Sequence, residues 1–478
     1  MREGSEWKPL PVTGDPYRGV DETELDGISA FVIDAYVNEL EHTVKRPGTL
    51  VYRNLGTSVP VDGVYWWDRQ NAAIYVSGGR VFQEKDGLVK EITGATLQTG
   101  RKVSFATDGT KLLMANGGQM VHMTLDGVLT TMADADAPTT VSHVAYLDGY
   151  VFANNLNTGQ FYRSAIGDLT SWAAADFATA EGKPDDIVAL HEGWNELVLV
   201  GRESIEFWYN DGFTPFSRLQ GGVIQDGCEA PYTFAQVGDA WMYLNKDRRF
   251  VKITGRTPQS VSFPFDRFIQ DLTTVSEAIA DVVDMAGQLF YVVTFPIADR
   301  TLVYNVHRKQ WHEWGYWDTN TTSYRRFIGQ HHAYARAWNK HLIGDRETGL
   351  IYELKRGHYA DGANDDVIRS VRRTGFNSHG SLIRKRSHAL RMRLKRGLGH
   401  VSESTGPTNP TMQVRYRDTA GAWGNERAVS LGQVGQHELV AELRQLGMYT
   451  VRQWEFIHAD KTDWILSEAQ ELVEPLPR

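Results

Sequence analysis

The chain of 478 residues is 41% hydrophobic and 11% aromatic, which supplies enough apolar sequence for a sizeable core and excludes a largely disordered protein. Its longest apolar stretches have the length of a strand, far short of the roughly 20 residues of a membrane-spanning helix, so we expect no membrane insertion. A single cysteine, Cys228, excludes an intrachain disulfide and cysteine-rich zinc sites, and the formal net charge is −9 at pH 7.

Residues 1–55 are predicted to form an N-terminal segment. Its opening, Met1–Leu10, carries charged residues where a secretory signal peptide has an apolar run, so we expect synthesis and assembly in a cytoplasm. Two later runs, Ala30–Ile33 and Leu50–Tyr52, are apolar and of strand length. We expect these runs to pair with a distant part of the chain and to close a ring of repeats.

Residues 56–355 repeat one unit: a turn with Gly or Asn, an apolar strand, a polar turn and a second apolar strand. The units are Asn71–Gln83, Asp108–Met123, Asp148–Arg163, Gly193–Tyr209, Gly238–Ile253, Gly287–Val306 and Asn339–Leu354. They begin 37 to 52 residues apart, and short apolar runs flank most of them. A four-stranded propeller blade takes about 40–50 residues. The repeat therefore predicts an all-β fold, a β-propeller of seven blades, or of six if the first or last unit lies outside the ring. A β-sandwich array would lack this regular spacing.

Residues 356–478 are predicted to form a second, sandwich-like β domain, since the repeat ends after Leu354 and the polar, Gly-rich stretch Arg356–Asp366 follows. Apolar and polar residues alternate in Ala389–Lys395 and in Met412–Tyr416, as they do in half-buried strands. Helix is scarce in the sequence as a whole. The better helix candidates are Phe265–Val275 and Leu439–Leu446.

A block of positive charge lies in Ile368–Gly397, which contains ten basic residues and no Asp or Glu. Such a block indicates contact with a nucleic acid backbone or an acidic partner protein. The alternative is a solvated strand face, because part of the block has a period of two. Only Phe376 interleaves the charges, so base stacking is not expected, and DNA would be contacted through its phosphates without reading of sequence. The candidate contact residues are Arg369, Arg372, Arg373, Arg384, Lys385, Arg386, Arg391, Arg393, Lys395 and Arg396.

Catalytic motifs are missing from the sequence: it has no G-x-S-x-G, no Walker loop and no H-E-x-x-H. Arg415–Asn425 is a degenerate copy of the S-x-D-x-G-x-T-W turn of sialidase propellers, and such turns stabilise hairpins without taking part in chemistry. His331 and His332 are adjacent, so on a strand they point to opposite faces and are unsuited to one metal ion together with Asp345. We therefore predict no enzymatic activity, no catalytic residue, no metal and no cofactor.

Trp311, Trp314 and Trp317 form an aromatic cluster at the end of the sixth repeat. It has two readings. Aromatic clusters bind sugars, but the outer strand of a blade also needs bulky side chains for packing, and packing is the preferred interpretation.

The tail Met412–Leu472 carries a combination of motifs. Arg415, Tyr416, Asp418, Gly421, Trp423, Asn425 and Glu426 match an R-Y-S-D-D-G-G-x-T-W-S-N-E segment; Leu431, Gly432 and Gly435 match L-G-x-x-G; and Leu446 with Gly447 matches R-x-L-G. Near the start, Arg46-Pro47-Gly48 matches an R-P-G element. In this combination the chain resembles the packaged-DNA stabilisation proteins of short-tailed phages, also called tail hub or nozzle proteins. It departs from their pattern at Thr419–Ala422 and at Lys461-Thr462.

The resemblance implies a structural protein of the virion tail. It implies a ring of six copies that extends the DNA channel below the portal and its adaptor, helps to retain the packaged double-stranded DNA, and anchors needle, spike or fibre proteins. The basic block would then face either the DNA or the adaptor. Two alternatives stay open at this point: a glycan-binding or glycan-cleaving propeller used in host attachment, and a cellular scaffold propeller.

Overall fold

The computed structural model describes residues 5–17, 20, 31–180, 185–212, 216–403, 406–419, 421–437 and 441–476. In this part of the chain nearly all regular structure is β-strand, and α1 (Asp266–Asp271) is the one α-helix, beside the 3₁₀ turns η2 (Asp68–Gln70) and η3 (Pro231–Thr233). None of the described helices is long and apolar enough to cross a membrane.

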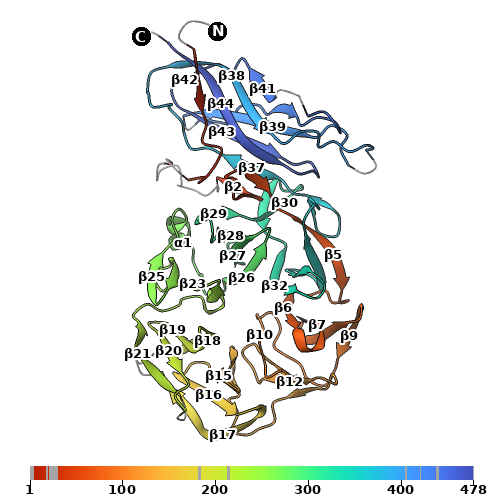
Figure 1. The fold of residues 1–478 in the computed structure, drawn as a ribbon, viewed down its shortest axis with the longest axis vertical. Coiled ribbons are helices and arrows are strands. Elements are labelled where there is room, and N and C mark those ends of the chain that lie inside the picture. Colours follow the sequence, from red (N-terminus) through yellow and green to blue (C-terminus); the bar gives the residue numbers. More distant parts are fainter. Residues whose placement is uncertain are drawn as a thin grey trace.

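Six groups of four antiparallel strands form separate sheets, arranged around a ring (Figure 1). In chain order the first five are β6 (Val61–Trp67), β7 (Ala72–Ser77), β8 (Arg80–Lys85) and β9 (Leu88–Ile92); β10 (Ser104–Thr107), β11 (Lys111–Ala115), β12 (Val121–Thr124) and β13 (Leu129–Thr131); β14 (Val144–Leu147), β15 (Tyr150–Asn154), β16 (Gln160–Ala165) and β17 (Asp168–Thr179); β18 (Ile187–Gly193), β19 (Glu196–Gly201), β20 (Ile205–Tyr209) and β21 (Ser217–Ile224); and β22 (Ala235–Val237), β23 (Ala240–Leu244), β24 (Phe250–Thr254) and β25 (Thr257–Ser260). The sixth separate sheet contains β32 (Gly329–Ala335), β33 (Lys340–Asp345) and β34 (Leu350–Lys355), and its outer strand is β5 (Gly48–Asn54) from the N-terminal segment.

A seventh group of four strands lies between them in the ring: β26 (Ile279–Met285), β27 (Gln288–Phe295), β28 (Arg300–Asn305) and β29 (Gln310–Glu313), which belong to a nine-stranded sheet. Among the described residues, a separate cluster of buried apolar side chains joins each blade to the next, and β26–β29 pack in this way against the blades on both sides. The predicted all-β propeller with a C-terminal β region is confirmed. The predicted counts of seven and of six blades both have a counterpart: the ring contains seven four-stranded groups, of which six are separate sheets and one is shared with the C-terminal region.

The propeller pattern was readable because the second strand of a blade is covered on both faces by its neighbours. Every residue of β7 and of β23 is buried, and apart from Ser77 at the end of β7 these residues are all aliphatic or aromatic. The hairpin turns carry the residues that a left-handed backbone requires: Asp86-Gly87 and Asp148-Gly149 both have positive φ at both positions, as in type I′ turns. The predicted run Leu50–Tyr52 lies in β5 and pairs with β34, whereas Ala30 lies outside the described residues.

The C-terminal region is a sandwich of two sheets. One has the order β3-β4-β44-β38-β41, with β1 paired to β44 and β42 to β38; the other is the outer part of the nine-stranded sheet, β2-β37-β43-β39-β40. Their strands are β1 (Glu6–Pro9), β2 (Val32–Ile33), β3 (Ala35–Val37), β4 (Thr43–Lys45), β37 (Ser370–Arg373), β38 (Lys385–Leu394), β39 (Thr411–Asp418), β40 (Arg427–Ser430), β41 (Ala441–Arg444), β42 (Met448–Tyr449), β43 (Arg452–His458) and β44 (Ile465–Pro475). The core between the sheets includes Leu390, Leu466, Trp454 and Phe456.

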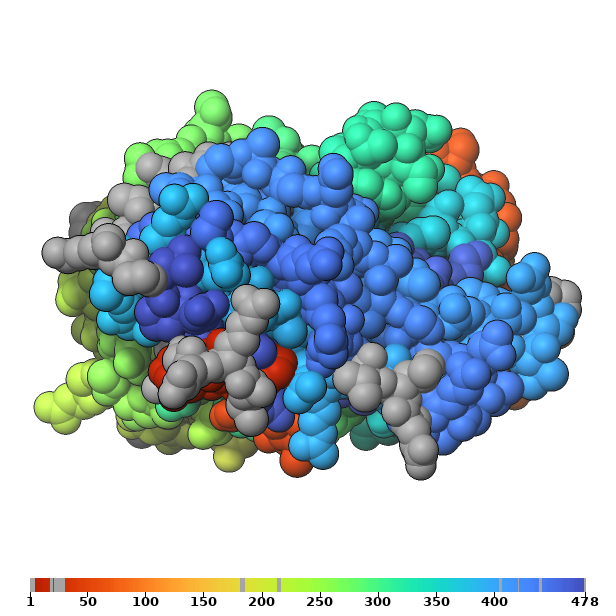
Figure 2. Space-filling view, turned by 90° about the horizontal axis from the view of Figure 1, so that it is seen from above, coloured from red at the N-terminus to blue at the C-terminus, as the bar shows by residue number. Residues whose placement is uncertain are grey.

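One strand joins the two parts of the molecule. β2 runs parallel to β29 of the propeller, with Ile33 opposite Glu313, and antiparallel to β37 of the sandwich, with Ile33 opposite Val371. The sandwich therefore continues a propeller blade through backbone hydrogen bonds and stands at the rim of the ring (Figure 1). Seen from that end, the C-terminal residues cover the centre of the molecule (Figure 2).

Two short hairpins complete the junction: β30 (Gly315–Asp318) with β31 (Ser323–Arg326), and β35 (Ala360–Asp361) with β36 (Asp366–Val367). Of the two helix predictions, Phe265–Val275 contains the short helix α1. Of the predicted helix Leu439–Leu446, the first two residues lie outside the described residues, and the rest of the prediction is wrong: Ala441–Arg444 is strand β41, which pairs with residues 389–392 of β38. Helical propensity is a weak preference, and a sheet partner outweighs it here.

Candidate functional site

The ten residues of the basic block do not form one patch, because they belong to both sheets of the sandwich. Arg372 and Arg373 lie in β37 of the nine-stranded sheet, whereas Lys385, Arg391 and the residues around them lie in β38 of the other sheet. The outward faces of a two-layer sandwich point in opposite directions. The block therefore divides into residues with different surroundings.

Part of the block is structural. Arg372 is fully buried, its Nη2 donates to the carbonyl of Pro11 at 3.0 Å, and burial lowers its pKa to about 10. Lys385 is also buried, and its ammonium group donates to three backbone carbonyl oxygens at 2.6 to 2.9 Å. Groups held in this way stabilise the fold and are not offered to a partner.

The outward face of β38 carries Arg391 and Arg393, and Lys395 follows directly after the strand; all three are exposed, as the period of two predicts. Two of them are paired: Arg391 lies 2.5 Å from Glu442, and Lys395 lies 2.6 Å from Asp463. Arg393 forms no ion pair with a described residue, and the same holds for exposed Arg384 and half-buried Arg386. These three carry the positive charge that the sandwich leaves unneutralised here.

A groove of about 700 Å³ runs along this face between Trp7 and Met448. Its wall includes Arg386, His388 and Arg391, and the Arg391 guanidinium lies 4.6 Å from the centre of the Trp7 ring. We call this the C-terminal groove. Exposed apolar surface at Met448 beside cationic side chains suits an acidic segment of a partner protein.

The opposite face of the sandwich carries an arginine–tryptophan face that the sequence pattern did not reveal. It consists of Arg369, Arg373, Arg415, Arg417, Trp317 and Trp423. The ring of Trp423 has three guanidinium groups, those of Arg373, Arg415 and Arg417, within 4.9 to 5.2 Å of its centre, and Arg369 lies 4.6 Å from that of Trp317. Trp423 lies 50 residues after Arg373 in the chain, so only the strand pairing of β37, β43 and β39 brings these groups together.

Carboxylates partly neutralise the arginine–tryptophan face. Burial acts to raise the pKa of Glu455, but Arg373 and Arg415 outweigh it and the net shift is downward. Glu426 lies 3.3 Å from Arg415 and 4.0 Å from Arg369. Over residues 356–478 there are 18 Lys and Arg against 14 Asp and Glu, a net charge of +4, which leaves −13 for residues 1–355. The two parts of the chain thus differ in the sign of their net charge, but the positive charge of the C-terminal part is moderate.

Arg46, of the R-P-G element, is the centre of a buried ion network at the junction. It is fully buried and pairs with Asp34 at 2.7 Å and with Asp361 at 2.5 Å. Its Nη2 also donates to the carbonyl of Gly315 at 2.9 Å. Burial raises the pKa of Asp34 to about 6, against the opposing effect of Arg46. The network ties the N-terminal segment to the hairpins β30–β31 and β35–β36.

The R-Y-x-D element makes a second buried network, inside the sandwich. Asp418 accepts from Arg452 at 2.7 and 3.0 Å, and Arg452 is buried beneath the rings of Tyr416 and Tyr449. Glu471 lies beside them without exposure and accepts from Tyr449 at 2.9 Å. The motif residues therefore hold β39, β43 and β44 together.

Comparison with known protein families gives one match. A family model described as Bacteriophage P22 Gp10, beta-propeller, matches residues 47–359, from the strand that closes the ring to just beyond the last blade. The chain belongs to this phage stabilisation family. It is accordingly a phage structural protein, and the resemblance noted in its motifs is confirmed.

Solved structures add only a likeness of fold to the family assignment. BamB from Moraxella catarrhalis is 13% identical over 61% of this chain and 82% of its own, with a TM-score of 0.37. The Pan2 WD40 domain from Neurospora crassa is 7% identical over 67% of this chain and 98% of its own, with a TM-score of 0.42. No curated protein matches the chain significantly.

The aromatic cluster of this family member is largely internal. Trp311 and Trp314 are 2% and 1% exposed and lie in clusters that join neighbouring blades. Trp317 is half-buried, in contact with Tyr324 and Arg369. This arrangement matches the packing interpretation and leaves no flat aromatic surface at Trp311 and Trp314 for a sugar.

The histidine pair is not brought together with Asp345. His332 contacts the carbonyl of Val282 through Nδ1 and the ring of His341 through Nε2, while Asp345 accepts from Tyr352. Within the described ranges, no group of three His, Cys, Asp or Glu side chains is placed to hold a metal ion.

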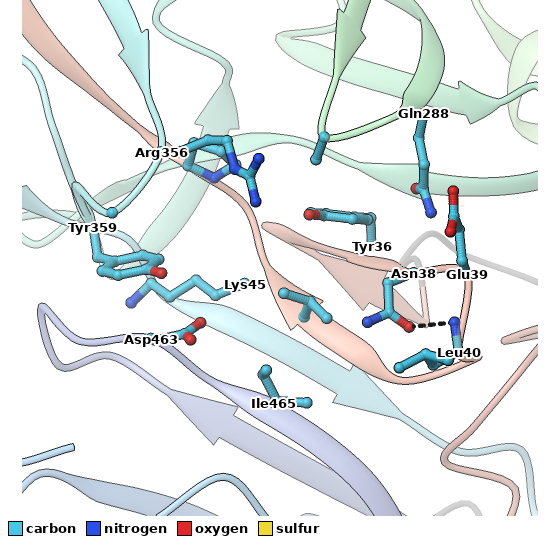
Figure 3. Close-up of a pocket in the computed structure, with 14 residues that line it drawn as sticks. Tyr36, Asn38, Glu39, Leu40, Lys45, Gln288, Arg356, Tyr359, Asp463 and Ile465 are labelled. Atoms are coloured by element: carbon cyan, nitrogen blue, oxygen red, sulfur yellow. Dashed lines mark hydrogen bonds between the residues drawn. The ribbon is translucent and has the colours of Figure 1, made fainter. Parts of the chain in front are cut away.

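A cleft of about 370 Å³ lies at the junction, between β3, β4 and the start of β44 (Figure 3). Its most buried charge is Lys45, which donates to the carbonyl of Asp460 at 2.7 Å, and burial together with Arg46 lowers its pKa to about 7. On the same side Tyr359 and Asp463 are hydrogen-bonded, as their neighbouring positions in Figure 3 suggest. These polar groups of the cleft are thus hydrogen-bonded within the protein, and we interpret the cleft as part of the structure of the junction.

Proposed function

We propose that the protein is a tail hub, or nozzle, of a phage virion. Six copies would form a ring that extends the DNA channel below the portal–adaptor complex, retains the packaged genome and anchors needle, spike or fibre proteins. The observation that carries this proposal is the phage stabilisation family match over the whole propeller. We expect the protein to act in the virion tail, after synthesis and assembly in the host cytoplasm.

The architecture of the protein supports a mechanical role. A ring of blades closed by β5 leaves few long free edges, and the nine-stranded sheet makes the sandwich an extension of one blade. Packed β structure with buried ion networks at its joint resists deformation as one body. A rigid subunit of this kind can withstand the pressure of packaged DNA without catalysing a chemical reaction. This agrees with a non-enzymatic protein that needs no cofactor.

The distribution of charge along the chain suggests how each subunit is oriented relative to the adaptor and the DNA channel. Residues 1–355 carry −13 and residues 356–478 carry +4. We propose that the sandwich faces the adaptor and docks through the C-terminal groove together with Arg384 and Arg393, which lie near the two ends of β38, while acidic propeller surface borders the channel. DNA would slide past such a surface because it lacks the cations that displace condensed counterions.

The docking test uses Arg384 and Arg393, since neither forms an ion pair with a described residue. Reversing Arg391 or Lys395 instead would place a carboxylate beside Glu442 or Asp463 and disturb the fold itself. The double variant Arg384→Glu/Arg393→Glu should abolish ring assembly on isolated portal–adaptor particles, seen by electron microscopy. Lys90→Glu, exposed on outer strand β9, is the control for charge and should assemble normally. Normal assembly of the double variant, with virions that keep their DNA, would leave its arginines as solvated charges only.

The alternative is a glycan-binding or glycan-cleaving propeller used in host attachment. The burial of Trp311 and Trp314 disfavours it. It predicts saturable binding of the purified protein to host surface polysaccharide, weakened by Trp317→Ala, since Trp317 is the half-buried member of the cluster. Absence of binding together with ring formation on the adaptor would decide for the hub.

A further inference from the structure

Two cavities lie on the axis of the propeller. The larger, of about 460 Å³, is lined by the blades of β6, β10, β22, β26 and β32; the smaller, of about 70 Å³, adds residues of the blades of β14 and β18. Since all blades contribute to one or the other, both cavities face the centre of the ring. We call the larger one the axial vestibule.

A side chain that crosses the ring separates the two cavities. Lys102, just before β10, reaches β26 on the far side and donates to the carbonyl of Ala280 at 2.5 Å and to Asp281 at 3.1 Å. Asp281 also accepts from the backbone N–H of His331 at 3.0 Å. Lys102 lines both cavities, so this ion pair forms the floor of the vestibule.

The vestibule walls carry more positive than negative charge. Arg101, Lys102, Arg326 and Arg346 line it, together with the carboxylates of Asp62 and Glu277. The Arg346 side chain is only 4% exposed, and burial and nearby arginines lower the pKa of Arg326 and Arg346, although Asp299 lies 3.8 to 3.9 Å from both and Glu347 lies 3.2 Å from Arg346. A bound anion would relieve the repulsion between these guanidinium groups.

Buried polar atoms in the vestibule also lack partners. Asp62 Oδ2, His331 Nδ1 and Glu277 Oε1 accept or donate no hydrogen bond, although Asp62 and His331 are 3% and 4% exposed. Buried polar groups are nearly always hydrogen-bonded, so atoms of this kind in a cavity wall indicate a ligand with hydrogen-bond donors. The rim supplies apolar surface in Pro60, Pro296 and Ile297, the last 69% exposed.

We propose that the axial vestibule binds an acidic loop of a partner polypeptide. A peptide has carboxylates and carbonyls for the arginines, amide N–H groups for the unpartnered carboxylate oxygens, and apolar atoms for the rim. A phosphodiester offers only acceptors, so it would leave the unpartnered carboxylate oxygens without a donor. The volume lies within the range of about 300–1,000 Å³ found for specific pockets. This site is distinct from the C-terminal groove and does not depend on ring formation.

The test uses the purified full chain and three probes, the tripeptides acetyl-Gly-Glu-Gly-amide and acetyl-Gly-Gln-Gly-amide, and inorganic phosphate. Binding is followed by ligand-observed NMR. The glutamate peptide should bind at millimolar concentration or below and about tenfold more tightly than the glutamine peptide, as expected for a charge-assisted contact. Stronger competition by phosphate than by the glutamate peptide would indicate a simple anion site and overturn the proposal, as would equal binding of both peptides.

Variants locate the binding. Arg101 is exposed, so Arg101→Gln should leave the fold intact and weaken the glutamate peptide about tenfold. Arg80→Gln, on strand β8, is the matched control and should bind like the parent. Arg326→Gln provides a second wall residue, with its folding checked by thermal unfolding. If both wall variants bind like the parent, the peptide is bound elsewhere and the proposal is wrong.

Discussion

At the scale of single residues, the conspicuous charges of this chain act mainly inside the molecule. Arg46, Arg372, Lys385 and Arg452 are buried at the junction or in the sandwich. A buried ion pair gives little net stability compared with apolar packing, but removing one partner is costly, because the other charge is then left without compensation. These residues therefore fix one arrangement of the strands around them.

The Arg46 network gives the first prediction. Arg46→Met leaves Asp34 and Asp361, which are 0% and 1% exposed, without their cation, and should destabilise the protein by about 3–5 kcal/mol. The shift of the denaturant midpoint measures this effect. Arg80→Met removes a half-exposed pair with Glu91 and should cost less than about 1 kcal/mol. Equal effects of the two substitutions would show that the network does not hold the junction.

Asp62 gives a pH-dependent prediction. Burial raises its pKa from 3.8 to about 6, so between these values the folded state retains a proton that the unfolded state has lost. Its contribution to stability is therefore lost as pH rises from about 4 to about 6. Asp62→Asn should raise the melting temperature relative to the parent at pH 7, and much less at pH 4. Asp126→Asn, at an exposed turn, is the control, and a gain independent of pH would contradict the assignment.

At the scale of elements, the sequence reveals pairing between strands that are neighbours in the chain and hides pairing between strands that are far apart in it. The repeat is visible because each blade consists of neighbouring strands with turn residues such as Asp148-Gly149 between them. The two-residue strand β2 is invisible, since its role comes from partners near residues 313 and 371. The sequence around strand β41 favours a helix, because β38, the partner that makes it a strand, lies about 50 residues earlier.

The same distinction applies to the candidate site. Counting charges finds the basic block, yet the carboxylates that neutralise it, such as Glu442 and Asp463, come 50 to 70 residues later. Trp423 joins Arg373 only through the pairing of β37, β43 and β39. A charge count therefore locates basic residues without telling which of them remain unneutralised and available to a partner.

Strand β5 gives a prediction at this scale. A Cβ atom on Gly48 would lie 2.0 Å from the carbonyl oxygen of Ala360, a backbone atom that cannot move aside easily. Gly48→Val should therefore prevent β5 from closing the ring and cost at least about 4 kcal/mol, measured by thermal unfolding and soluble yield. Val51→Thr, at a 38% exposed position of the same strand, should be nearly neutral. A stable Gly48→Val protein would show that closure tolerates a displaced hairpin.

At the scale of the whole molecule, the nine-stranded sheet should make propeller and sandwich unfold together. Ile33→Pro removes the N–H of the strand that joins them, and we expect two calorimetric transitions in place of one. Limited proteolysis should then cut near residues 356–370. Ile33→Val, which keeps the backbone donor, should behave like the parent. A single transition in the proline variant would mean that side-chain packing alone couples the two parts.

The placement of the N-terminal segment has a consequence for synthesis. β5 pairs with a strand that ends at residue 355, and β1 pairs with residues 470–473 of β44. The first strands to leave the ribosome therefore stay unpaired for most of translation: the ring stays open until residue 355 has been made, and the sandwich until translation is nearly complete. Because unpaired edges associate readily, this delay makes the nascent chain sensitive to chaperone supply. It also means that a truncated chain, lacking β44, cannot complete the sheet in which β44 pairs with β1, β4 and β38.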